Sequence, residues 1–200
     1  MTGTPRRAHF DYGLHWWAAA VASRHVVIDT AETRLPQRHG HHRYSVCGPN
    51  GVQQLTIPIK ADTRTMTTPL HEVLISEHAN WRRVHWGALY SAYGRSPYFD
   101  YVADELEAIF NGRQLRLLDF DRQVQELVTQ FMQLPVTFDY LPLDQSAANC
   151  PTLLDTQNIH DVNYYQVWAS RHGFVPNLSI FDLMMNQGPE GIFTLLKMAE

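Results

Sequence analysis

Two titratable residues lie in segments that are otherwise apolar, and either of them could take part in acid–base chemistry. His85 is flanked by Trp81, Trp86 and Tyr93 in a segment with helical hydrophobic spacing. Aromatic walls of this kind also line ligand pockets, and an imidazole titrates near neutral pH. His85 is therefore a candidate general base. The alternative is a core histidine that is hydrogen-bonded to the backbone.

Asp182 is the second candidate, and it lies near the start of a helical stretch. Asn177 and Asn186 flank it, and this density of polar groups across the largely apolar residues 174–185 is typical of the floor of a polar pocket. A carboxylate there could orient a base or a substrate amine. The simpler interpretations are that Asp182 favours the positive end of a helix dipole and that Asn177 and Ser179 are helix caps.

Three histidines in one loop raise the question of a metal site. His39, His41 and His42 all carry the imidazole that zinc accepts. Adjacent loop histidines need a distant partner to complete a tetrahedral site, and no such partner is evident in the sequence. We therefore expect adventitious binding at most, and no resident metal or cofactor.

The chain has only two cysteines, Cys47 and Cys150. A nucleophilic thiol needs an adjacent base and a lowered pKa, and neither is indicated beside Cys47. Reduced, unbonded thiols are expected, as is usual in a cytoplasmic protein.

Composition argues against several classes of function. The 200 residues are 44% apolar and 18% charged with a net charge of −4, and the basic residues form only short pairs such as Arg82-Arg83, so a nucleic-acid partner is not predicted. No apolar run approaches the roughly 20 residues of a membrane span. Asp11 and His15 interrupt the stretch that most resembles a signal peptide, so we expect a cytoplasmic chain. The phosphate-loop, dinucleotide, zinc-protease and hydrolase motifs are all absent from the sequence.

Hydrophobic spacing predicts the elements that must position these side chains. Helical spacing marks residues 14–23, 81–93, 98–110, 124–131 and 180–187, and Pro189 is placed to begin a last helix. Strand-like spacing marks residues 25–29, 44–46, 52–59, 71–75 and 137–141. The order predicts a mixed α/β (α+β) domain over residues 1–200, with a strand-rich N-terminal half and a helical C-terminal half.

Two local signals are sharper than the rest. Asn50-Gly51 separates two strand-like runs, and because both residues tolerate positive φ it predicts the tip of an antiparallel hairpin. Ser179 followed by Asp182 resembles a capping box in which Asp replaces the usual Glu.

Three blocks of the sequence form a recognisable pattern. Residues 177–190 read Asn-Leu-Ser-Ile-Phe-Asp-Leu-Met-Met-Asn-Gln-Gly-Pro-Glu, after a Tyr-Gln at 165–166 and a Gly-Phe at 173–174. Residues 81–99 carry a Trp, then His-Trp, Ala-Tyr and Pro-Tyr-Phe, and residues 50–58 join the Asn-Gly turn to Leu-Thr-Ile-Pro. With the Val-Val-Ile-Asp strand at 26–29, these blocks resemble the WbqC-like protein family.

The resemblance implies a setting and a set of roles. The family is associated with bacterial surface-polysaccharide (O-antigen) gene clusters, which implies transfer of an acyl or aminoacyl group onto a sugar amine in a small, sugar-derived substrate. On that interpretation His85 is the general base, and Asp182 orients it or the amine. The residues expected to bind or position the substrate are Arg43, whose planar fork suits a phosphate or carboxylate, and Asn50, Tyr93, Asn177 and Asn186.

The sequence departs from the family pattern in the loop after the first strand. Arg43 matches, but His42 and Gln37 stand where the family has Asn and Lys, and the N-terminal motif is altered over residues 13–17. A changed or lost activity is therefore an open alternative, with the protein acting as a non-catalytic ligand-binding or scaffold protein. A further alternative is a nucleotide-binding domain that holds phosphate at a helix N-terminus.

Overall fold

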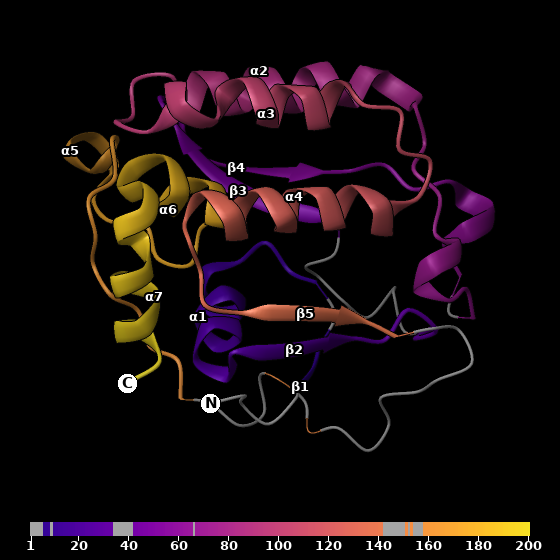
Figure 1. The fold of residues 1–200 in the computed structure, drawn as a ribbon. Coiled ribbons are helices and arrows are strands. Elements are labelled where there is room, and N and C mark those ends of the chain that lie inside the picture. Colours follow the sequence, from indigo (N-terminus) through magenta and orange to yellow (C-terminus); the bar gives the residue numbers. More distant parts are fainter. Residues whose placement is uncertain are drawn as a thin grey trace.

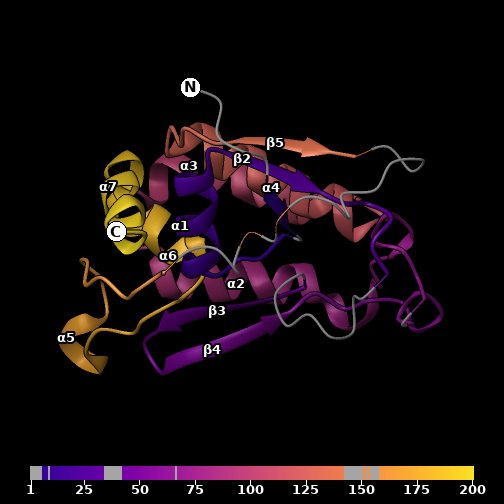
Figure 2. The same ribbon diagram turned by 90° about the horizontal axis from the view of Figure 1, so that it is seen from below.

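The strands of the fold divide between a small parallel sheet and an antiparallel hairpin (Figure 1). The structure is a computed structural model, and it describes residues 6–8, 10–33, 42–65, 67–141, 151, 153 and 158–200. In the parallel sheet β2 (His25–Ile28) lies between β1 (Arg6–Ala8) and β5 (Thr137–Tyr140). The hairpin and this sheet lie apart, with helices between them (Figures 1 and 2). The mixed α/β class predicted from the sequence is confirmed.

The first helix connects β1 to β2. Helix α1 (Leu14–Ser23) has the bounds that its alanine-rich sequence predicts, and eight of its ten residues are buried. It ends at Arg24, which adopts a left-handed conformation (φ 62°) and donates its backbone N–H to the carbonyl of Ala20. The chain then enters β2, which is buried from Val26 onward. Strand β1, which carries only three residues, was not predicted.

The hairpin forms where the sequence predicts it, but its turn differs in detail. Strands β3 (Arg43–Gly48) and β4 (Gly51–Thr56) pair so that Gly48 lies opposite Gly51, which leaves Pro49 and Asn50 as the turn. Only Gly51 takes a positive φ, of 97°, and Asn50 does not. Of the two residues that tolerate a positive φ, only Gly51 therefore uses that freedom. Pro49 fixes the first turn position, and the left-handed residue follows the turn.

The longer helices form one layered group. Helix α2 (Trp81–Tyr93) packs on β3 and on α3 (Phe99–Asn111), and α3 in turn packs on α4 (Leu117–Phe131). The short helix α5 (Ala169–His172) precedes α6 (Ile180–Gln187), and a 3-10 turn at Gly188–Glu190 leads into α7 (Gly191–Met198). Helix α7 packs against α1, so the C-terminal helix covers the first one.

One predicted strand is absent. Residues 71–75 do not form a strand, because Leu70–Glu72 is a 3-10 turn and the next residues make only isolated bridges. Leu74 pairs with Arg116 and Ile75 pairs with Ile59, so successive residues bond to different segments and no continuous ladder develops.

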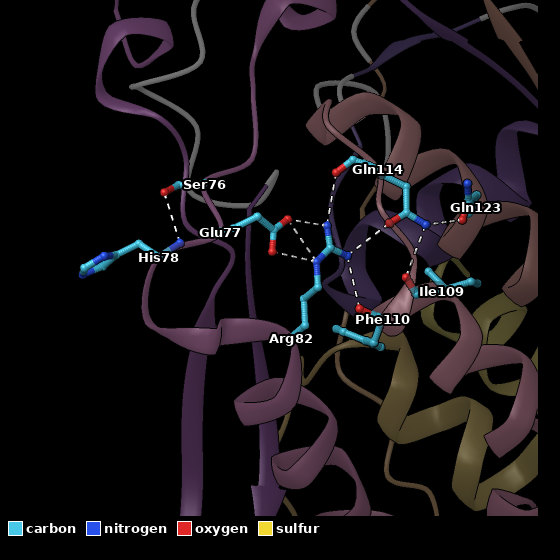
Figure 3. Close-up of polar contacts among 8 residues, drawn as sticks. All are labelled: Ser76, Glu77, His78, Arg82, Ile109, Phe110, Gln114 and Gln123. Atoms are coloured by element: carbon cyan, nitrogen blue, oxygen red, sulfur yellow. Dashed lines mark hydrogen bonds and ion pairs between the residues drawn. The ribbon is translucent and has the colours of Figure 1, made fainter.

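A buried arginine ties α2 to the turn between α3 and α4 (Figure 3). Arg82 donates from Nε and Nη2 to the carboxylate of Glu77, at 3.2 and 2.9 Å. Its remaining donors reach the carbonyl of Phe110 and the side chain and carbonyl of Gln114, each at 3.1 Å. All five guanidinium hydrogens are thus used. The guanidinium also lies over the ring of Trp81, 4.6 Å from its centroid. Arg82 therefore stabilises the fold and has no donor left for a ligand.

The predicted capping box at the start of α6 does not form. Ser179 occupies the N-cap position, but its buried hydroxyl makes no hydrogen bond to any described residue. The carboxylate of Asp182, which would complete the box, instead accepts hydrogen bonds from Tyr164 and Gln166. Ser179 and Asp182 have the spacing of a capping box, but the Asp182 carboxylate is hydrogen-bonded to side chains from another segment instead.

A pair of serine substitutions tests this arrangement. Ser179→Ala should leave the free energy of unfolding within about 0.5 kcal/mol of wild type, because no side-chain cap is lost. Ser96→Ala is the matched control, since the buried Ser96 hydroxyl donates to the carbonyl of Tyr93 at 2.6 Å. Its loss should cost about 1 kcal/mol. Urea unfolding measures both values, and an equal loss in the two variants would show that Ser179 does cap α6.

Candidate functional site

A buried carboxylate on α6 is the centre of the main polar cluster. Asp182 is 1% exposed, and its Oδ2 accepts the hydroxyl of Tyr164 at 2.5 Å and the amide of Gln166 at 3.1 Å. Burial raises the pKa of Asp182 from 3.8 to about 6, and hydrogen bonds from Tyr164, Tyr93, Gln166 and Asn186 partly oppose that rise. The result is a carboxyl group that titrates close to neutral pH.

Two amide side chains hold the segment that carries Tyr164 in place. Gln166 bonds both the N–H and the carbonyl of Val175, each at 2.9 Å. Asn186 accepts the N–H of Val167 at 3.0 Å and donates to the backbone carbonyl of Asp182 at 2.8 Å. The extended chain before α5 is thereby fixed across α6 by side chains, without a strand ladder.

A surface groove lies between the hairpin tip and the C-terminal end of α2. One part is a cavity of about 560 Å³ and an adjoining part is about 320 Å³, and the two share Pro49, Ser91 and Ala92. We call the two together the hairpin-tip groove. The first part is completed by Tyr90, Gly94, Arg95 and Trp168, and the second by Val46, Gly48, Asn50, Gly51, Val52, Gln53 and Ala88.

The polar cluster lies directly behind this groove. Gly48 and Ala92 line the groove, while their immediate neighbours in the chain, Cys47 and Tyr93, interact with Asp182. Trp168 joins the two regions, because its indole N–H donates to the carbonyl of Ala92 at 2.7 Å.

A histidine from α5 fixes the hairpin tip. Nε2 of His172 lies 3.1 Å from the carbonyl oxygen of Gly48 and 3.3 Å from that of Pro49, so it donates when it carries the proton. Both views place α5 beside the end of the hairpin (Figures 1 and 2).

His85 is enclosed in the core. It is 3% exposed, its Nδ1 lies 2.9 Å from the hydroxyl of Tyr44, and its ring is hydrogen-bonded to the backbone of Thr56. Burial lowers the pKa of His85 to about 4, so the ring is neutral at physiological pH. The ring of Trp81 packs edge-on against it at 5.0 Å. These are the contacts of a core histidine, and they leave almost none of its ring exposed.

Arg43 lies at the opposite end of β3 from the groove. The five strand residues between it and the turn span roughly 16 Å. Its buried Nε has no hydrogen-bond partner in the described part of the chain. The neighbouring His42 has a pKa lowered to about 4, first by burial and then by the positive charges of Arg43 and Arg64.

Asn177 has a structural position. It adopts a left-handed conformation (φ 47°), and its side-chain oxygen accepts the N–H of His15 at 3.0 Å. Asn177 therefore caps the first turn of α1 from a distant part of the chain.

The structure thus brings together some of the predicted site residues and separates others. Asp182, Tyr93 and Asn186 form the cluster, and Asn50 lies at the groove in front of it. Three further residues lie elsewhere: His85, Arg43 and Asn177. Sequence reasoning missed Tyr164 and Trp168, which belong to a segment without helical or strand periodicity. Gln166 was part of the family pattern, but its role was not identified.

Other predicted features can be placed only in part. Cys47 is a free, buried thiol, and burial and the nearby Asp182 raise its pKa, which is the opposite of nucleophilic activation. Cys150, Gln37, His39 and His41 lie outside the described residues. Within the described ranges no group of three or more His, Cys, Asp or Glu side chains could hold a metal ion. No helix in those ranges is long and apolar enough to cross a bilayer.

A larger surface hollow lies elsewhere, at the turn between α3 and α4. It measures about 820 Å³ and is lined by long charged side chains, which are Arg113, Arg116, Asp119, Arg122 and Glu126, together with Gln114, Leu115 and Gln123. Arg122 pairs with Glu126 at 3.0 Å across its surface. The hollow contains charges of both signs and no aromatic side chain, so we place the candidate site at the hairpin-tip groove.

Comparison with known proteins identifies a family. The sequence profile of the WbqC-like protein family matches residues 17–149. The chain is also 23% identical to the uncharacterized protein Rv1507c of Mycobacterium tuberculosis, over 93% of this chain and 90% of that protein. No solved structure matches significantly. The profile match includes Asn50 and Tyr93 but ends before Asp182.

The raised pKa of Asp182 predicts how stability changes with pH. The folded protein binds this proton more tightly than the unfolded chain does, so the stabilisation is complete below about pH 4 and is lost as pH rises through about 6. Relative to Asp182→Asn, the wild-type free energy of unfolding should fall by on the order of 3 kcal/mol between pH 4 and pH 7.

Urea unfolding of both proteins across this pH range measures the difference. The comparison with Asp182→Asn is needed because His42 and His85 also change stability with pH. Their lowered pKa values make the folded protein more stable as pH rises, which opposes the effect of Asp182. Both proteins share that contribution, so it cancels. Parallel pH profiles would show that Asp182 does not titrate in this range.

Proposed function

Because the chain belongs to the WbqC-like protein family, we propose that it is a small-group transferase of bacterial surface-polysaccharide synthesis. It moves an acyl or aminoacyl group from an activated ester or thioester onto the amine of a sugar-derived acceptor. The acceptor binds in the hairpin-tip groove. The amine nitrogen forms a bond to the acyl carbon, and the bond from that carbon to the donor's oxygen or sulfur breaks.

Asp182 is the proton acceptor in this proposal. The amine loses one proton as the new bond forms, and that proton passes through a tyrosine hydroxyl to the carboxylate and then to the departing oxygen or sulfur. Tyr164 is the relay, because it is only half-buried and its hydroxyl is 2.5 Å from Oδ2 of Asp182. A buried carboxyl is otherwise unable to reach a substrate.

The observation that carries the proposal is the pKa of about 6 at Asp182, combined with its position behind the groove. Proton transfer is most effective when the pKa of the acceptor is near the working pH. An ordinary aspartate has a pKa of 3.8, about two units too low. At neutral pH most molecules would carry the ionised form, which is the form that accepts a proton.

A second function is favoured by one specific observation. The described residues that line the groove include the hydroxyls of Tyr90 and Ser91, but no thiol, carboxylate or imidazole. A groove of that composition can bind a ligand without performing chemistry on it. A non-catalytic member of the family would use the same groove and would show binding but no turnover.

Substitution of two buried aspartates tests the catalytic role. With an acyl donor and an amino-sugar acceptor, Asp182→Asn should lower the rate of product formation by at least about 100-fold, a typical loss for a general base. Mass spectrometry detects the acylated sugar. The matched control is Asp121→Asn. Asp121 is also 1% exposed and also accepts a tyrosine hydroxyl, that of Tyr12 at 2.6 Å, but it lies on α4 away from the groove.

The outcomes separate the two functions. If Asp182→Asn and Asp121→Asn retain equal activity, Asp182 is not the proton acceptor. Tyr164→Phe keeps the ring and removes the relay hydroxyl, so it should also lower the rate even if Asp182→Asn proves unstable. If the wild-type protein binds the ligand but forms no product with any donor, the non-catalytic function is favoured.

A further inference from the structure

We infer that the hairpin-tip groove binds a pyranose that carries an anionic group, with the ring against Trp168 and Tyr90 and the charge paired with Arg95. The identification of the molecule as a sugar rests on the proposed function. The charge of the ligand and its position in the groove come from the groove itself.

The size of the groove fits a sugar with one substituent. The main part, about 560 Å³, lies within the range of roughly 300–1,000 Å³ that is usual for small-molecule sites. The adjoining part along the hairpin adds about 320 Å³ and gives room for a group attached to the ring.

The aromatic walls are held in place before any ligand arrives. The indole of Trp168 is fixed by its hydrogen bond to the carbonyl of Ala92. Tyr90 is 62% exposed, yet its ring packs edge-on against Phe99, with centroids 5.5 Å apart and an interplanar angle of 82°. The electron-rich face of an aromatic ring attracts the C–H hydrogens on one face of a pyranose. Little ordering would be required on binding.

Among the described residues that line the groove, Arg95 is the only one that carries a full charge. It is exposed, and it makes no hydrogen bond or ion pair in the described structure. Arg82 and Arg122 differ, since the first uses every donor within the fold and the second pairs with Glu126. The planar fork of Arg95 is therefore available for a carboxylate or a phosphate.

The end of α2 does not oppose an anion as strongly as a bare helix C-terminus would. A helix C-terminus carries partial negative charge on its unpaired carbonyls. Here the carbonyl of Tyr90 accepts from the N–H of Gly94, that of Ala92 from Trp168, and that of Tyr93 from Ser96. These carbonyls are already paired, so the charge of Arg95 dominates the rim of the groove.

Polar groups suited to sugar hydroxyls complete the lining. Ser91 lies where the two parts of the groove meet, and the exposed Asn50 lies at the hairpin tip. A hydroxyl and a primary amide both donate and accept hydrogen bonds, as the hydroxyls of a sugar do. The sequence also predicts a substrate-binding role for Asn50, and that role stays a prediction.

Binding of three simple probes tests the inference. Isothermal titration and chemical-shift perturbation would compare glucose, glucuronate and glucose 1-phosphate, with no donor present. We expect at least one charged sugar to bind about tenfold more tightly than glucose. The two charged probes distinguish a carboxylate from a phosphate. Equal affinity for all three sugars would overturn the role of the charge.

Variants identify the residues responsible. Arg95→Gln should remove the preference for the charged sugar. Tyr90→Ala, at an exposed position, should weaken the binding of both charged and neutral sugars. Arg113→Gln is the matched control, because Arg113 is an exposed arginine of the other hollow. An equal effect of Arg113→Gln and Arg95→Gln would overturn the site. So would tighter binding of uridine monophosphate with shifts at Trp168, which would indicate a nucleotide instead.

The binding test and the test of the proposed function can fail separately. Asp182→Asn should still bind the charged sugar, because Asp182 does not line the groove. Binding that depends on Arg95, together with full activity of Asp182→Asn, would reject the proposed proton acceptor and leave the ligand site intact. Turnover that depends on Asp182 without any preference for a charged sugar would reject only the present inference.

Discussion

The burial of the Asp182 carboxyl is the constraint on which the arrangement around the groove depends. A buried carboxylate without donors is strongly destabilising, so the fold must bring donors to it. Those donors come from α2, from α6 itself and from the segment before α5, and α2 is far from the other two in the sequence. Gathering them fixes the path of residues 164–167 across α6 and brings Trp168 against the end of α2. The segment that donates hydrogen bonds to Asp182 thus also forms one wall of the groove.

Other buried polar groups are also hydrogen-bonded within the fold and do not create a site. Arg82 has all five donors satisfied within the fold, and His85 is neutral and hydrogen-bonded to Tyr44. Asp121 accepts the hydroxyl of Tyr12, but it is far from the groove on α4, and burial raises its pKa as well. Burial and a shifted pKa are therefore insufficient to identify a functional group. What distinguishes Asp182 is that its partners Cys47 and Tyr93 adjoin residues that line an open groove.

Local signals in the sequence were sufficient for much of the fold. The helices at 14–23 and 81–93 follow from hydrophobic spacing, and the hairpin follows from its turn residues. Predictions failed where tertiary partners decided the outcome. Residues 71–75 bond to two different segments, and the acid expected to cap α6 instead accepts Tyr164. Asp182 itself was identifiable as a polar residue in an apolar stretch. Tyr164 and Trp168 were not, because contacts across the fold alone give them their positions.

The chemistry of the cluster also explains why an acid, and not an amide, suits position 182. Its neighbours Tyr164, Gln166 and Tyr93 all approach as donors, so a group that only accepts hydrogen bonds satisfies them best. An asparagine would turn an NH₂ group toward one of these donors. The ionised carboxylate meets that geometry in full, but its burial lowers stability as pH rises through about 6. In the proposed reaction the same ionisation lets the group accept a proton, so stability and the proposed reactivity would have opposite pH requirements. Such a conflict is expected where a buried acid serves a reaction and the surrounding fold compensates for its cost.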